Sequence, residues 1–84
     1  MKIVYFYSMK DAPNEIRAVA PAHAAYWRER RLPEYVGGPF ADRSGGLITF
    51  VVERAEEAER VVAADPFLTR GLLEDSIVKE WTPE

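Results

Sequence analysis

The first apolar stretch of the chain, residues 2–8, is apolar on both sides of an extended backbone. Its side chains divide between two faces, with Ile3, Tyr5 and Tyr7 on one and Val4 and Phe6 on the other. Since side chains alternate along a strand, and since Val, Ile, Tyr and Phe favour strands, the stretch predicts a β-strand with apolar contacts on both faces.

A helical pattern follows the turn-forming segment 9–14. Positions predicted to face inward recur every three or four residues: Ile16, Val19, Ala20, His23 and Trp27. This spacing predicts a helix from about residue 15 that ends at Leu32-Pro33. Because Pro21 lies inside the pattern, either the helix bends there or its regular part begins near residue 20.

Two strands are expected in the middle of the chain. Residues 35–40 contain glycines and proline, which suit a short strand at a sheet edge. Residues 41–46 are expected to form a turn, and residues 47–52 are the clearest strand of the chain.

The last third of the chain predicts a second helix, a single helical turn and a strand. Residues 55–64 carry strong helix formers, and Ala58, Val61 and Val62 are expected to form the buried side of this helix. Asp65-Pro66 is typical of an N-cap followed by proline at the first helical position, and Gly71 closes the turn. Residues 76–81 are mixed in polarity, as in an edge strand.

This order of elements predicts one ferredoxin-like α+β domain over residues 1–84. In the βαββαβ arrangement, two helices cover one face of a four-stranded antiparallel sheet. The other face is bare, and we expect Ile3, Tyr5 and one side of the 47–52 strand to leave apolar surface there. A chain of 84 residues buries only about 60 to 65% of its unfolded surface, so a homodimer formed through the bare face is expected.

Composition excludes several classes of protein and site. With 48% hydrophobic and 30% charged residues the chain folds in water, and it has no apolar run long enough for a membrane span. The absence of cysteine excludes disulfides and thiol chemistry. A net charge of −3 argues against binding nucleic acid, and Arg28, Arg30 and Arg31 are interpreted as solvated charges in the last turn of a helix. The opening segment lacks the features of a secretory signal, so a cytoplasmic location is expected.

His23 and Asp65 are the candidate catalytic residues. His23 is the only histidine and lies on the inward helix face, and Asp65 can point inward from the end of the second helix. If they meet, the carboxylate fixes the tautomer of the ring and leaves the other nitrogen as a base or acid near neutral pH. Alternatively, Asp65 only caps the Pro66 turn and His23 is a satisfied, partly buried histidine. An enzyme needs an open cavity beside the ring, whereas a pair without one favours a non-catalytic module.

No metal or cofactor is expected. A single histidine without cysteine leaves only an all-carboxylate metal site, and the glutamates cluster on one solvated helix face. Gly37-Gly38 and Gly45-Gly46 do not form a phosphate-binding motif and are interpreted as hairpin turn residues.

Short motifs are spread over nearly the whole chain: Pro21-Ala22-His23, Val36-Gly37-Gly38-Pro39, Gly45-Gly46, Glu57-Ala58, Ala64-Asp65-Pro66-Phe67, Gly71 and Trp81. Together they resemble the YCII-related family. The Asp-Pro-Phe followed by Gly is the most specific part, and the upstream histidine is the second. The resemblance implies a ferredoxin-like subunit of a dimeric α/β barrel, with His23 and Asp65 as the active-site pair.

The resemblance also implies a reaction type. The family is similar to small cofactor-free lyases and isomerases, including one that eliminates chloride from a chlorinated hydroxyquinol. We therefore expect an acid–base enzyme that acts on a small oxygenated molecule such as a ring compound. His23 is expected to transfer the proton while Asp65 orients it. The alternative is a small-ligand-binding or accessory dimerisation module.

Four further residues are candidates for substrate binding. Tyr5, Pro39 and Phe67 are expected in the pocket wall. Relatives often carry a basic residue just before the Pro-Ala-His, where this chain has Ala20. The nearest arginine, Arg17, either reaches an anionic substrate or is a solvated helix charge.

Overall fold

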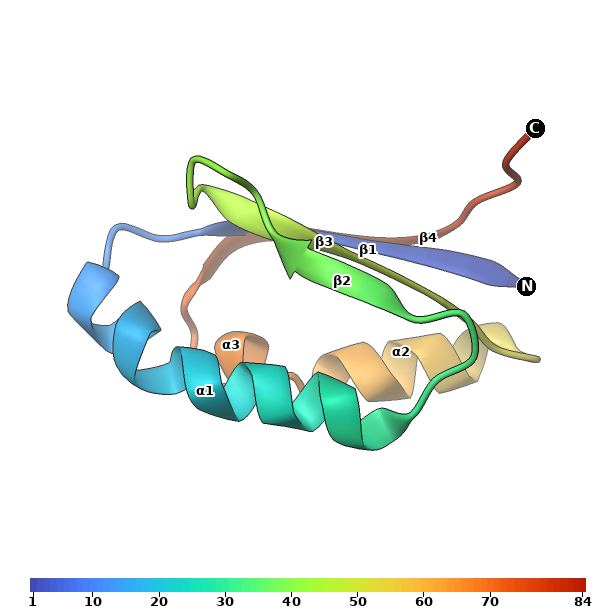
Figure 1. Cartoon of the computed structure of the whole chain (residues 1–84), viewed down its shortest axis with the longest axis horizontal. Helices are drawn as coiled ribbons and strands as arrows, with labels where there is room; N and C mark the ends of the chain where they lie inside the picture. Colours follow the sequence, from blue (N-terminus) through green and yellow to red (C-terminus); the bar gives the residue numbers. More distant parts are fainter.

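The computed structural model describes all residues 1–84 and forms a four-stranded antiparallel sheet with its helices on one face (Figure 1). The elements are β1 (Lys2–Met9), α1 (Pro13–Arg30), β2 (Val36–Pro39), β3 (Gly45–Val51), α2 (Ala55–Ala63), α3 (Pro66–Thr69) and β4 (Leu73–Glu80). The strand order is β2-β3-β1-β4. This confirms the ferredoxin-like βαββαβ fold.

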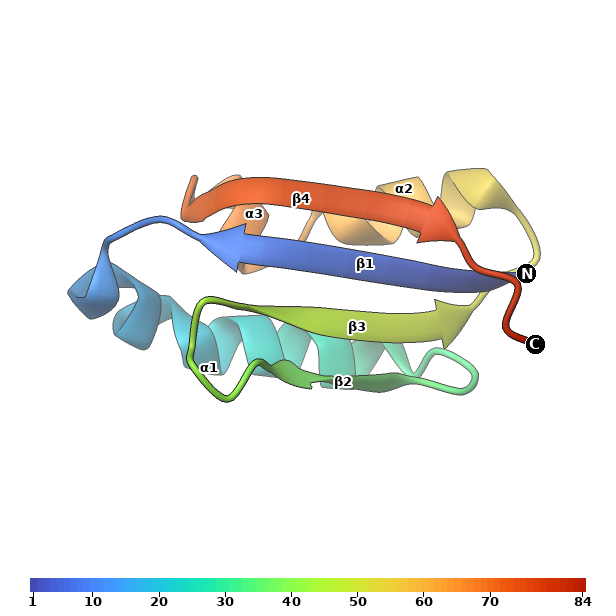
Figure 2. The same ribbon diagram turned by 90° about the horizontal axis from the view of Figure 1, so that it is seen from above.

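The helices form a single layer beneath the sheet. Figure 2 shows α1 behind β2 and β3, whereas α2 and α3 lie behind β1 and β4. The short helix α3 packs against α1 near the middle of this layer. The connection between α2 and α3 therefore comes close to the face of α1 that points at the sheet.

The core lies between the sheet and the helices and is strongly aromatic. On the covered face, Tyr5 pairs in register with Ile48, and Ile3 pairs with Phe50. All four side chains are buried, and Trp27 from α1 packs against the rings of Tyr5 and Phe50. The inward stripe predicted for the first helix is therefore correct at Trp27.

The expectation that Ile3 and Tyr5 belong to the bare face is wrong. Both are buried beneath the helices, and the opposite face of β1 exposes Phe6 instead. Phe6 pairs in register with Leu47 on β3 and Ile77 on β4, which are also exposed. Because β1 is apolar on both faces, the alternation of its side chains alone does not indicate which face is buried. The Tyr5 hydroxyl finds a buried acceptor on the covered side, which favours that orientation.

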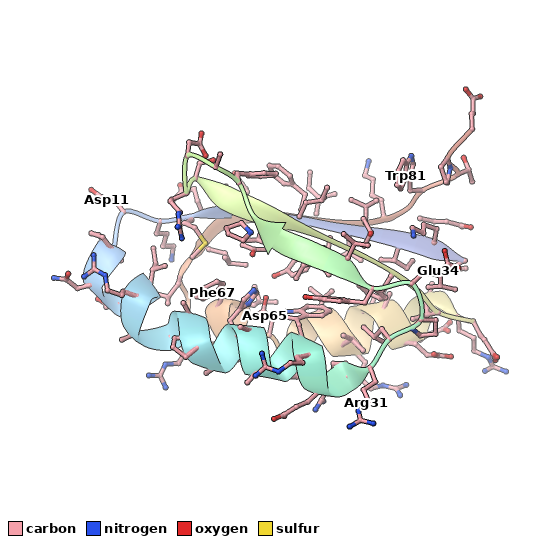
Figure 3. All side chains as sticks on the ribbon, in the orientation of Figure 1. Asp11, Arg31, Glu34, Asp65, Phe67 and Trp81 are labelled. Atoms are coloured by element: carbon pink, nitrogen blue, oxygen red, sulfur yellow. The ribbon has the colours of Figure 1, made fainter.

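We give the name open-face patch to the large apolar side chains that are exposed on the bare face. It consists of Phe6, Val36, Leu47, Ile77 and Trp81. Figure 3 shows Trp81 on the side of the sheet opposite the helices.

α1 continues without interruption through Pro21. It starts with Pro13 in its first turn and ends at Arg30, so the alternative of a helix that begins near residue 20 is wrong. Pro21 is exposed, as is Arg17, whose carbonyl loses its usual helical donor. Water can replace that hydrogen bond at the solvent side of a helix, which explains why the helix tolerates the proline.

The expected turn over residues 41–46 is shorter in the structure, because Gly45 and Gly46 belong to β3. Gly45 pairs with Ser8, and a Cβ atom on Gly45 would collide with the backbone carbonyl of Tyr7. The glycine therefore permits the close approach of β1 and β3. At the other end of the chain, β4 begins at Leu73 rather than at Ser76. No helix has the combination of length and apolar composition that crossing a membrane requires.

Candidate active site

His23 and Asp65 lie side by side between the two layers of the fold. His23 follows Val19 and precedes Trp27 by four residues each, so α1 presents it toward the sheet. Asp65 occupies the junction between α2 and α3 and is seen between the layers in Figure 3. The distance from His23 Nδ1 to Asp65 Oδ1 is 2.7 Å. The exposed fraction of the His23 side chain is 12%, and that of Asp65 is 0%.

The Asp65 carboxylate accepts two further hydrogen bonds. The Tyr5 hydroxyl donates to Oδ2 over 2.9 Å, and the backbone N–H of Phe67 donates to Oδ1 over 3.0 Å. Asp65 is therefore the N-cap of α3 and the partner of His23 at the same time. An ionised carboxylate only accepts, so the hydrogen of the His23 contact belongs on Nδ1.

The second nitrogen of His23 is directed at Tyr7. The distance between His23 Nε2 and the Tyr7 hydroxyl is 3.4 Å. When the ring is neutral with its hydrogen on Nδ1, Nε2 has a lone pair that accepts from the Tyr7 hydroxyl. Burial raises the pKa of Tyr7 to about 12, and the nearby Asp65 carboxylate adds to this effect. Burial likewise raises the pKa of Tyr5, with Asp65 as the second cause. Both phenols therefore stay protonated at neutral pH.

The imidazole is also held from its face. The Phe67 ring stacks on it, with ring centroids 4.1 Å apart and an angle of 19° between the planes. On the sheet side, Gly46 leaves the space that the Tyr7 hydroxyl occupies, because a Cβ atom at this position would collide with the phenol. The ring of His23 thus has fixed neighbours at both nitrogens and on one face.

A cavity of about 570 Å³ lies beside His23, between α1 and the β2–β3 edge of the sheet. His23 and Tyr7 line it together with apolar and glycine residues. The other lining residues are Met9, Ile16, Ala20, Ala24, Arg28, Tyr35, Gly37, Gly38, Pro39, Arg43, Gly45, Ile48 and Phe67. Exposed residues such as Ala24 and Gly38 are part of this lining, so the cavity is open to solvent.

The four residues expected to bind substrate separate into two pairs. Pro39 and Phe67 line the cavity. Tyr5 does not, because its fully buried hydroxyl contacts Asp65 behind the histidine. Arg17 does not line it either, and its guanidinium donates to Asn14 Oδ1 over 3.2 Å. Six residues before His23, at about 100° per residue, Arg17 points away from the side that carries the histidine.

Four polar residues of the cavity were not among the site residues expected from the sequence: Tyr7, Arg28, Tyr35 and Arg43. Tyr7 shares a strand face with Tyr5, which was an available signal. Arg28 lies four residues after Ala24 on the cavity side of α1, so its interpretation as a purely solvated charge is incomplete. Arg43 lies in the β2–β3 connection, where no periodicity indicates the direction of a side chain.

The structure contains no cluster of three or more potential metal-ligating side chains. The pair itself, an imidazole held by a carboxylate at Nδ1 and with its Nε2 beside a phenol, is suited to accepting and returning protons in the cavity.

Two solved structures resemble this one over nearly the whole chain. The first is 5-chloro-2-hydroxyhydroquinone dehydrochlorinase (TftG) from Burkholderia phenoliruptrix, in complex with 2,5-dihydroxybenzoquinone. It has 25% sequence identity and a TM-score of 0.81, over 98% of this chain and 94% of that chain. The second is Atu4242 from Agrobacterium tumefaciens, with 17% identity and a TM-score of 0.54, over 99% and 92%.

A third structure shares the fold at lower similarity. SnoaB from Streptomyces nogalater, a cofactor-independent oxygenase, has 19% identity and a TM-score of 0.50, over 99% of this chain and 93% of that chain. No curated protein sequence matches this chain. The model of the YCII-related domain matches residues 1–82, and the chain therefore belongs to the YCII-related family.

Proposed function

We propose that this protein is a cofactor-independent acid–base enzyme of the lyase or isomerase type that acts on a small oxygenated ring compound. One observation carries the proposal. The imidazole of His23 is bound at Nδ1 by a fully buried carboxylate, 2.7 Å away, while the same ring lines an open cavity of about 570 Å³. A purely structural pair does not need that cavity.

The proposed chemistry begins with proton transfer to His23 Nε2. A ring hydroxyl or a C–H group of the substrate gives up its proton, and the electron pair of the broken bond remains on the substrate. In an isomerisation the proton returns to a different atom. In an elimination the leaving group departs with its bonding pair, so that the substrate loses HX overall. Neither reaction changes the total number of electrons on substrate and products, so neither consumes an oxidant or reductant.

Asp65 and Tyr7 have different roles in this scheme. The Asp65 carboxylate keeps Nδ1 protonated and stabilises the imidazolium that forms when Nε2 accepts a proton. The Tyr7 hydroxyl lies 3.4 Å from Nε2 and lines the cavity, so it can donate a hydrogen bond to an oxygen of the bound substrate instead. Tyr5 acts only through Asp65, because it has no surface in the cavity.

The comparisons support this reaction class. TftG is a dehydrochlorinase of a chlorinated hydroxyhydroquinone and was captured with a dihydroxybenzoquinone, and its fold covers almost the whole of this chain. We propose ring compounds of this kind as the first substrates to test. We also propose a cytoplasmic location, the compartment expected from the sequence.

We further propose that the protein is a homodimer that pairs through the open-face patch. Phe6, Leu47 and Ile77 lie side by side at the centre of the bare sheet face, and all three are exposed. Burying apolar side chains of this size against a second copy removes them from water, and a two-fold pair is the commonest symmetric arrangement.

The catalytic proposal is tested by the release of chloride from chlorinated hydroxyquinol at neutral pH, with hydroquinone and hydroxyquinol, which have no chlorine to lose, as comparison compounds. His23→Gln and His23→Ala are expected to lower kcat/KM by about 100-fold or more, since general acid–base catalysis contributes about 10²–10⁴-fold. Arg60→Gln, on the exposed side of α2, is the matched control and keeps wild-type turnover. Thermal unfolding of each variant reports whether it folds. Turnover that survives in a folded His23→Gln protein contradicts the proposal, and a wild-type protein that turns over no compound favours the binding-module alternative.

A further inference from the structure

The cavity beside His23 carries positive charge without a matching negative charge. Two guanidinium side chains, Arg28 and Arg43, line it. No carboxylate does, because Asp65 is fully buried behind the imidazole. Neither arginine has an acidic side chain within ion-pair distance, since the ion pairs of the structure are Lys2–Glu34 and His23–Asp65.

Arg28 extends a row of small side chains along α1. Ala20, Ala24 and Arg28 are four residues apart, and all three line the cavity. Residues at this spacing lie above one another on a helix face. The two alanines leave room along the helix, and the long arginine follows them on the same side. A flat molecule that enters beside the alanines therefore meets the arginine side chain on the α1 wall.

Arg43 belongs to the opposite wall, in the connection between β2 and β3. Its backbone adopts the left-handed conformation, with φ of 65°. Two of the hydrogen bonds that hold the turn run from the Arg43 N–H to the Phe40 carbonyl over 2.9 Å and from the Ser44 N–H to Asp42 Oδ1 over 2.9 Å. Glycine adopts this conformation more readily than arginine does, so the requirements of the turn do not explain the guanidinium.

The apolar side chains of the cavity suit a ring. Ile16, Ile48 and Phe67 supply apolar surface, and Phe67 already stacks on His23. A planar guanidinium binds oxygen anions through two parallel N–H groups and more strongly than it binds neutral oxygens. The cavity thus combines apolar surface for a ring with an arginine on each of two walls.

We propose that Arg28 and Arg43, each from its own wall of the cavity, bind anionic oxygen of the ligand, so that the substrate is a negatively charged ring compound. The charge is either an ionised ring hydroxyl, as in a hydroxyquinone, or a ring carboxylate. That the ligand is a substrate rests on the proposed function, whereas the binding of an anion by the two arginines does not. In the acid–base scheme the two arginines also stabilise negative charge that develops on the ring when His23 takes a proton.

The test is a calorimetric titration of the full chain with three probes. Two are anionic at neutral pH, 2,5-dihydroxybenzoquinone with ionised hydroxyls and 2,5-dihydroxybenzoate with a carboxylate, and the third is neutral 2,5-dimethoxybenzoquinone. The wild-type protein is expected to bind at least one anionic probe about tenfold more tightly than the neutral one. Arg28→Gln and Arg43→Gly are each expected to lower the affinity for that anionic probe by about tenfold and to leave the affinity for the neutral probe unchanged. Added salt reduces the difference.

The variants are chosen so that loss of binding is not loss of folding. Arg43→Gly relieves the left-handed backbone, so its unfolding temperature is expected to equal or exceed that of wild type. Arg60→Gln is the charge-matched control and binds all probes as wild type does. Equal binding of anionic and neutral probes, no binding of either anion, or full anion binding in both arginine variants overturns the inference. The anionic probe that binds more tightly shows whether the charge on the ligand is an ionised hydroxyl or a carboxylate.

Failure of the proposed function gives a different result. His23→Gln retains an intact arginine pair, so it is expected to bind the anionic probe within about threefold of wild type. Arginine-dependent anion binding without turnover of any compound supports the anion site and contradicts the enzyme. His23-dependent turnover with a preference for neutral rings supports the enzyme and contradicts the anion site.

Discussion

The hydroxyl of Tyr7 fills the space in which any residue other than glycine at position 46 would place its Cβ atom. Tyr7 and Gly46 are direct partners in the β1–β3 register, so the sheet brings the phenol over the glycine. This relationship directs the Tyr7 hydroxyl to His23 Nε2. A residue with no side chain thereby controls one of the two nitrogens of the candidate base.

Substitution of Gly46 by alanine is expected to displace the Tyr7 phenol. The added methyl group overlaps the phenol, which costs about 1–3 kcal/mol of stability in a packed site. Turnover falls by about tenfold or more, because small displacements of positioned groups have large effects on rate. Urea unfolding and steady-state kinetics measure the two effects. Gly38→Ala is the matched control for stability, because no atom lies within 4 Å of the position that its Cβ atom would take. Equal stability of the two variants contradicts the prediction.

Asp65→Asn separates the capping role of this residue from its role toward His23. Asparagine caps helices as well as aspartate does, so α3 is expected to persist. The Tyr5 hydroxyl, His23 and the Phe67 N–H all donate to the carboxylate, whereas an amide accepts only at its oxygen. At least one donor therefore loses its acceptor, and the free energy of unfolding falls by about 1–3 kcal/mol. The turnover number falls by about 10²–10⁴-fold, because Nδ1 loses its anionic partner. The measurement is kcat in a variant whose circular dichroism is native, and an unchanged kcat would show that the pair is structural.

Stability is expected to fall at alkaline pH because of the buried phenols. Burial raises the pKa of Tyr5 and Tyr7 above the ordinary value of 10.0, to about 12 for Tyr7. The folded state therefore keeps protons that the unfolded state releases. The contribution is complete below pH 10 and decreases as the pH rises toward 12. Urea unfolding at increasing pH measures the slope, and Tyr5→Phe makes it shallower. A slope that does not change in this variant contradicts the assignment to Tyr5.

Leu47→Glu is expected to separate the proposed homodimer. Leu47 lies at the centre of the open-face patch, beside Phe6, and burying an unpaired carboxylate there is unfavourable. Sedimentation velocity at micromolar concentration is expected to show a dimer for wild type and a monomer for the variant. Glu59→Lys, on the exposed side of α2, changes charge away from the patch and keeps the dimer. A monomeric wild-type protein would contradict the proposal.

The order of the elements and the meeting of His23 with Asp65 were predictable from local pattern. The 3.6-residue period places His23 on the face of Trp27, and an Asp-Pro pair marks a helix start. Both features depend on near neighbours in the sequence. The ferredoxin-like arrangement then allows only one side of the sheet for both helices, which brings the two residues together.

The remaining features depend on partners that are distant in the sequence. Tyr5 and Phe6 are equally suited to a core, and only the acceptor on Asp65, sixty residues away, favours burying Tyr5. Gly46 is of a residue type that is common in turns, but its role depends on the Tyr7 side chain on a neighbouring strand. Arg43 lies in a loop, where the direction of a side chain has no periodic signal.

The hydrogen bonds of Asp65 join parts of the chain that are 60 and 42 residues apart, at Tyr5 and at His23. β1, α1 and the α2–α3 junction must all pack together before the His23 imidazole can bind the Asp65 carboxylate. No fragment that ends before residue 65 contains the pair, and no partly folded chain that lacks one of the three contacts holds it in place. Proton-transfer activity is therefore expected to disappear in the same cooperative step as the fold, which makes it a sensitive indicator of the native population.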